Sequence, residues 1–144
     1  MRRCSLLLLL VISSFARGQL LITEASVRLL PPSLPNTSAY FKVENIGNRD
    51  RVLVGASSAI AEVAELHNHI MLGDMMRMEK QDTITIGSGQ TVIFAPGGLH
   101  MMIFALKKPL QNGQNVRLVL HTKDGEKHSF PAKVGEPTQS THHH

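Results

Sequence analysis

The chain has 144 residues, a formal net charge of +4 and 42% hydrophobic residues. This length suits one compact domain with its own hydrophobic core. Beyond residues 1–18, twelve Lys and Arg residues stand against eleven Asp and Glu residues, which favours neither nucleic acid nor an anionic membrane surface as a partner.

Residues 1–18 have the features of a secretory signal peptide. The segment begins with two arginines, continues with the apolar run Leu6 to Ile12 and ends in the small-residue cleavage signal Ala16 to Gly18. The apolar run is too short to span a bilayer. We therefore expect a cleaved signal, with an uncleaved anchor as the less favoured alternative, and a mature periplasmic protein that starts at Gln19.

The single cysteine, Cys4, precedes the apolar run and leaves with the signal. It therefore cannot be a lipid anchor placed behind that run. The domain that we expect over residues 19–135 has no thiol for a disulfide, a redox centre or a metal site. Its fold must be stabilised by the hydrophobic core alone.

Strand patterns dominate the expected domain, because alternating or β-branched apolar residues recur between turn residues. The predicted strands are 21–29, 39–44, 51–55, 61–71, 75–81, 91–94, 100–105, 115–121 and 128–134. Many short strands at a spacing of about ten residues predict an all-β fold, an antiparallel Greek-key sandwich or barrel.

The last segment, residues 136–144, is polar and is expected to be a flexible tail. It ends in His142, His143 and His144. Three imidazoles suit Cu(II) or Zn(II), but an expression tag would have the same sequence. Both interpretations of the tail remain open.

All methionines after Met1 lie in one stretch of the predicted domain, together with three histidines. They are Met71, Met75, Met76, Met78, Met101 and Met102, with His67, His69 and His100. Thioether sulfur is soft and uncharged, and with neutral imidazole it forms a ligand set suited to Cu(I) outside the cytoplasm.

A two-residue Gly73-Asp74 loop would make a hairpin in which His69 faces Met78 and Met71 faces Met76. Alternation then places these four side chains and His67 on one face of the hairpin. A slip of one residue in the register would destroy this grouping.

Alternation also separates candidate ligands from packing residues. His100 and Met102 point to one side of their strand, about 7 Å apart, and Met101 points to the other. We expect Met75 and Met101 in the core and Met76 as a hydrophobic shield.

The spacing His67-x10-Met78-x21-His100-x-Met102 resembles the signature of the periplasmic copper chaperones called PCuAC. The neighbouring motifs Ala64-Glu65-Leu66-His67, Met76-Arg77-Met78, Pro96-Gly97-Gly98 and Leu106-Lys107-Lys108-Pro109-Leu110 carry the same resemblance. It extends over roughly residues 22–134 of the chain. Leu99 departs from the family pattern, which often has an aromatic residue before the histidine.

This resemblance implies a cupredoxin-like or immunoglobulin-like β-barrel that carries Cu(I) in an exposed site and is not an enzyme. The implied ligands are His67, Met78, His100 and Met102. The family resemblance further implies delivery of copper for cytochrome c oxidase assembly, to an oxidase subunit or through a Sco-type thiol protein. Whether His69 and Met71 share or alternate as ligands is left open.

The same residues bear on other functions. A general periplasmic copper buffer and a metal-free β-sandwich interaction module remain alternatives. A blue-copper electron-transfer site needs a cysteine ligand, which the mature chain lacks. A histidine-brace monooxygenase is disfavoured because residue 19 is glutamine.

Overall fold

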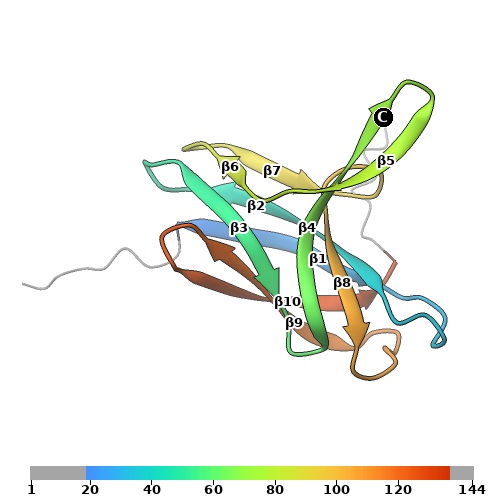
Figure 1. Ribbon diagram of the computed structural model, residues 1–144. Coiled ribbons are helices and arrows are strands. Elements are labelled where there is room, and N and C mark those ends of the chain that lie inside the picture. Colours follow the sequence, from blue (N-terminus) through green and yellow to red (C-terminus); the bar gives the residue numbers. More distant parts are fainter. Residues whose placement is uncertain (1–18, 137–144) are drawn as a thin grey trace, which may run out of the picture.

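The structure is a computed structural model that describes residues 19–136 (Figure 1). The expected signal peptide lies outside these residues, and so does the expected tail except for Glu136. Ten β-strands make up the described part, and no helix there is long and apolar enough to cross a membrane. The strands are β1 (Leu20–Arg28), β2 (Thr37–Asn45), β3 (Arg51–Ser57), β4 (Ala61–Leu72), β5 (Met75–Lys80), β6 (Ile84–Ile86), β7 (Thr91–Phe94), β8 (His100–Leu106), β9 (Asn115–Thr122) and β10 (Lys127–Gly135).

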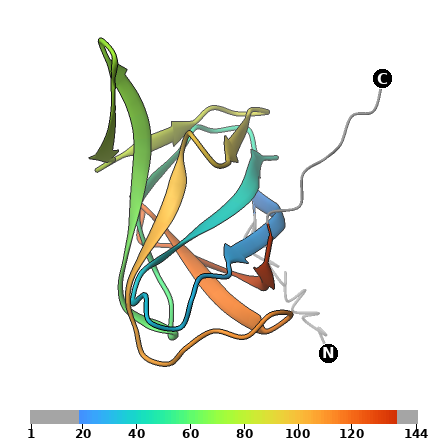
Figure 2. The ribbon, with the colours of Figure 1, turned by 90° about the vertical axis from the view of Figure 1, so that its right-hand side faces the viewer.

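Seven of the strands close into a barrel (Figures 1 and 2). Their order around the barrel is β4, β8, β2, β1, β10, β9 and β3, and the pairing of Ala56 with Ala64 joins β3 back to β4. Every neighbouring pair is antiparallel except β1 and β10, which run parallel. The all-β barrel predicted from the sequence is therefore confirmed, with one parallel pair.

The other three strands extend the barrel wall at its edges. β5 pairs with β4, β6 with β3, and β7 with β2. Nine of the ten strands were predicted from alternation. β6 was not, because three residues are too few to show a periodic pattern.

The core lies inside the barrel and consists of the inward-facing residues of its strands. Phe41 stacks on Phe94 with ring centroids 4.4 Å apart, and it meets Phe130 edge-on at 5.0 Å. Such aromatic pairs add to the stabilisation that burial alone provides. Met101 is fully buried in this core, as predicted.

The β4–β5 hairpin projects beyond the barrel (Figures 1 and 2). Gly73 occupies the first position of its two-residue loop with φ of 63°, as a type II′ turn requires. The register pairs His69 with Met78 and Met71 with Met76, which confirms the predicted hairpin. The prediction that Met75 lies in the core is wrong: it is 74% exposed, since the hairpin has no barrel wall behind it.

Candidate metal centre

Three strands bring the predicted ligands to one face of the sheet. The β4–β8 register sets His67 opposite His100 and Glu65 opposite Met102. Opposite residues of an antiparallel pair point to the same face. The intervening residues fill the core, so these side chains lie on the outer surface of the barrel, and β5 brings Met78 to the same face. We call His67, Met78, His100 and Met102 the metal face.

His100 is held in a defined orientation and tautomer. Its Nδ1 lies 2.9 Å from the carbonyl oxygen of Gly98, which also accepts the backbone N–H of His69. Because a carbonyl only accepts, Nδ1 carries the proton and Nε2 keeps a free lone pair. That Nε2 lies 3.2 Å from Met78 Sδ. Two acceptors aimed at each other at this distance suit a cation that both can bind.

His67 contributes a second imidazole, which is mostly buried. Its side chain is 12% exposed, and neither ring nitrogen has a hydrogen-bond partner among residues 19–136. Glu65 Oε1 lies 3.9 Å from Nε2, which is beyond hydrogen-bonding distance. The His67 ring centroid lies 5.9 Å from that of His100. Buried polar atoms without partners are costly, and metal ligation would satisfy one of these nitrogens.

Met102 lies on the same face but has a different neighbour. Its Sδ accepts a hydrogen bond from the Ser38 hydroxyl of β2, with Oγ and Sδ 3.7 Å apart. The β2–β8 pairing places these two residues opposite each other. Sequence reasoning missed Ser38, because a contact across so long a separation along the chain leaves no local pattern.

The sequence left open whether His69 and Met71 are ligands, and the structure places these two residues differently. His69 stacks on His100 with ring centroids 4.8 Å apart, and its Nδ1 is buried without a hydrogen-bond partner in the described residues. Met71 is 60% exposed and pairs with Met76 nearer the tip of the hairpin. His69 therefore lies beside the predicted ligands, and Met71 lies further out.

Within residues 19–136, no three side chains of His, Cys, Asp or Glu are grouped to hold a metal ion. Methionine sulfur supplies the other candidate donors on this face, with Met78 Sδ beside His100 and Met102 Sδ beside Ser38. Glu65 forms an ion pair with Lys80, with Oε2 and Nζ 3.2 Å apart. Glu65 lies opposite Met102 on the metal face, so this ion pair places a carboxylate beside the predicted ligands.

Burial lowers the pKa of the His100 imidazole below its usual 6.5. The nearby His69 and His67 lower this pKa further, while the hydrogen bond to Gly98 opposes the shift. His100 is therefore kept in the neutral form that binds metals.

We expect the metal-free protein to lose stability as the pH falls below 6.5. The folded-state pKa of His100 is lower than that of the unfolded chain, so in this range the unfolded state binds the proton more readily. Its contribution is present above pH 6.5 and is lost on acidification. Urea unfolding at a series of pH values would measure the slope, and H100Q should flatten it. Equal slopes in both proteins would contradict this account.

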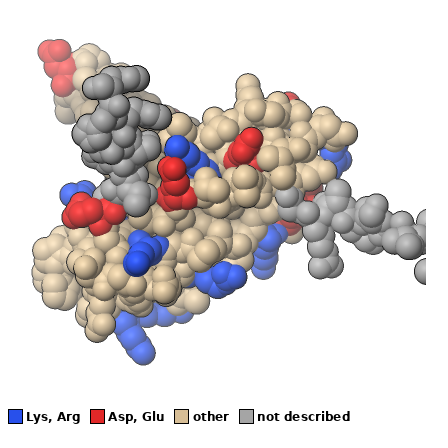
Figure 3. Space-filling view, turned by 180° about the vertical axis from the view of Figure 1, so that it is seen from behind, with Lys and Arg blue, Asp and Glu red and all other residues tan. Residues whose placement is uncertain are grey.

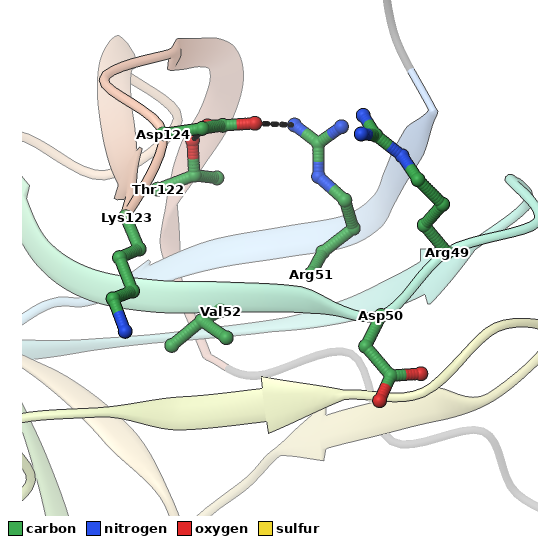
Figure 4. Close-up of a pocket in the computed structure, with 7 residues that line it drawn as sticks. All are labelled: Arg49, Asp50, Arg51, Val52, Thr122, Lys123 and Asp124. Atoms are coloured by element: carbon green, nitrogen blue, oxygen red, sulfur yellow. Dashed lines mark hydrogen bonds and ion pairs between the residues drawn. The ribbon is translucent and has the colours of Figure 1, made fainter.

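A separate hollow of about 290 Å³ lies between the start of β3 and the β9–β10 turn (Figure 4). Arg51, 4% exposed, pairs there with Asp124 at 3.6 Å and with Glu126. These ion pairs connect β3 to the β9–β10 turn. Arg49, Asp50 and Lys123 also line the hollow. On the side shown in Figure 3, acidic and basic side chains both appear on a mainly uncharged surface.

Residues 20–134 match the family described as "Putative lipoprotein LpqE-like". The chain is 31% identical to DR1885 of Deinococcus radiodurans, solved in its Cu(I) form, with a TM-score of 0.66 over 86% of this chain and 85% of that one. The copper-bound PCuAC domain of PmoF2 has the same fold, with 22% identity and a TM-score of 0.70 over 83% of this chain and 95% of that domain.

A curated relative, "Putative lipoprotein Lxx21020" of Leifsonia xyli subsp. xyli (strain CTCB07), is 36% identical over 90 residues. The match covers 62% of this chain and 54% of the relative, so the chain spans about half the length of the curated protein that it matches. The chain belongs to the LpqE-like family, which is of the PCuAC type, and the resemblance drawn from the sequence is confirmed.

Proposed function

We propose that the protein is an exported copper carrier that binds Cu(I) at the metal face. The observation that carries this proposal is the pair formed by His100 Nε2 and Met78 Sδ, two unprotonated donors 3.2 Å apart. Membership of the PCuAC type and the copper-bound relatives support it. Imidazole and thioether together suit Cu(I).

The same ligand set explains how a carrier would release its ion. Neutral ligands leave the positive charge of Cu(I) uncompensated, so a thiolate of a partner can compete for it. Met78 is 45% exposed, whereas His100 behind it is 3% exposed. A partner thiolate would therefore approach from the Met78 side, form its bond to copper and displace the thioether before the imidazoles.

The recipient that we propose is a copper centre of cytochrome c oxidase, reached directly through an oxidase subunit or through a Sco-type thiol protein. A general copper buffer of the periplasm is the second candidate. The two differ in one measurable respect: a delivery protein transfers Cu(I) faster to its recipient than to a small thiol of equal affinity. We also propose that residues 1–18 are removed on export and that the tail histidines bind Cu(II).

The deciding experiment is anaerobic competition for Cu(I) against a chromophoric chelator. It uses the full chain in which His142, His143 and His144 are replaced by alanine, so that only the folded domain is tested. Retained tight binding of Cu(I) is the expected result. A folded protein that leaves all Cu(I) with the chelator would refute the carrier function. If the tail histidines bind Cu(II), the same variant should lose Cu(II) binding. Unchanged Cu(II) binding would refute that proposal.

Mild oxidation should weaken the site without unfolding the protein. Met78 is exposed and becomes the sulfoxide, which replaces the soft sulfur donor, while buried Met101 is protected. We expect Cu(I) affinity to fall by about tenfold or more, which is at least the loss seen when a residue that supports a metal ligand is mutated. Peptide mass spectrometry would locate the oxidised residues, and methionine sulfoxide reductases should restore the affinity. Unchanged affinity with Met78 fully oxidised would exclude it as a ligand.

A further inference from the structure

The projecting hairpin exposes an unusual number of apolar side chains. Met71 is 60% exposed, Leu72 53%, Met75 74%, Met76 60% and Met78 45%. Met71, Met76 and Met78 share one face of the hairpin, and grouped exposed apolar side chains of this kind are typical of functional sites in soluble proteins. Four of the five side chains are methionines, although leucine or valine would serve equally well for packing.

These methionines are ordered along the hairpin. On the metal side, Met71 faces Met76 near the tip, and His69 faces Met78 one step further in. His67 and His100 follow at the barrel wall. Each step of two residues advances about 7 Å along the strand. The sulfur and nitrogen donors thus form a continuous line from the tip to the metal face.

Exposure falls along the same line. Met71 and Met76 at the tip are 60% exposed, Met78 is 45% exposed, and His100 is 3% exposed. His69 lies between the outer pair and the inner ligands, with its ring stacked on His100 and a buried, unpartnered Nδ1. A copper ion that arrives at the tip would therefore meet donor atoms in order of increasing burial.

We propose that Met71 and Met76 form an outer Cu(I) site, which captures the ion and passes it, with His69, to Met78 and the rest of the metal face. This inference rests on the proposed function and adds the route by which the ion arrives. Directly opposed residues have Cβ atoms about 4.5–5.5 Å apart, so the two flexible thioethers can reach one ion. Transfer is ligand exchange: a bond from copper to an inner donor forms as a bond to an outer thioether breaks, and copper remains Cu(I).

The opposite face of the hairpin provides an internal control. Met75 is more exposed than either outer thioether, but it pairs with Leu72 and points away from the metal side. An apolar docking surface would use Met75 as readily as Met76. A relay of donors would not, because Met75 has no histidine or second methionine opposite it.

The test measures how fast the protein takes Cu(I) from its chelator complex in anaerobic stopped flow. The doubly substituted M71L/M76L protein keeps apolar side chains but loses both outer sulfurs. We expect capture to slow by about tenfold while the equilibrium affinity stays within about twofold. M75L, the matched control, should capture copper at the wild-type rate.

Methionine methyl NMR gives a second readout that does not depend on rates. The Met71 and Met76 signals should shift when Cu(I) is added beyond what the metal face holds, and the Met75 signal should not. Wild-type rates in M71L/M76L, unshifted methyl signals, or equal slowing in M75L would each overturn the relay while the carrier function stands. A wild-type chain that takes up no Cu(I) would overturn both proposals.

Discussion

H100A is expected to reduce the affinity for Cu(I) by more than about 100-fold. This loss is larger than that caused by mutating a side chain that contacts a metal ligand but not the metal. The substitution removes the Nε2 donor that faces Met78 Sδ, together with the hydrogen bond to Gly98 that fixes the tautomer. Anaerobic chelator competition measures the effect. M78L should produce a loss in the same direction, because leucine retains the bulk of methionine without its sulfur.

The matched control for this prediction is H121A. His121 lies on β9, where its Nε2 is 2.8 Å from the Ser57 hydroxyl, and it belongs to neither the metal face nor the hairpin. We expect its removal to leave Cu(I) affinity at the wild-type value. Equal losses in H100A and H121A would mean that copper binds histidines without regard to their place in the fold.

M101A is expected to lower the free energy of unfolding by about 2–5 kcal/mol, the usual cost of truncating a fully buried methionine. Met101 is completely buried between the two outward-facing residues of β8, and it packs in the barrel core. Urea denaturation of the metal-free protein would measure the change. The comparison is M75A at the exposed hairpin tip, where we expect a change within about 0.5 kcal/mol.

This comparison bears on the metal-free alternative, in which the methionines only pack. On that view M78L and M102L would alter stability without altering metal affinity. On the carrier view M78L changes affinity and leaves the free energy of unfolding of the metal-free protein nearly unchanged, since a half-exposed side chain contributes little to the core. Equal stability losses for M101A and M78A would favour the metal-free module.

The barrel was predictable because alternation is a local signal. Nine strands could be recognised from the spacing of apolar residues and the turn residues between them. β6, with three residues, carries no such period. The parallel pairing of β1 with β10 joins the two ends of the domain, and no local pattern sets its direction.

Part of the site was predictable, because the geometry of a two-residue turn sets the register of the β4–β5 hairpin. Gly73 and Asp74 determine the hairpin, and with it the pairing of His69 and Met78. The alignment of β4 with β8, which brings His67 opposite His100, depends on long-range closure of the barrel. Ser38 meets Met102 through the same closure, whereas the Gly98 carbonyl contacts the His100 ring from only two residues away. Met75 was misplaced because alternation identifies a face of the strand and not what covers it.

The division of the metal face between barrel and hairpin has a further consequence. Three of its four residues stand on strands of the closed wall, whereas Met78 stands on β5, which pairs with β4 and is exposed along its whole length. A strand with so few buried contacts opens more readily than the barrel. Copper that bridges Met78 and His100 would fasten β5 to the wall, and each opening of β5 would remove one ligand from the ion. The lifetime of the bound ion would then depend on how often the β4–β5 hairpin opens.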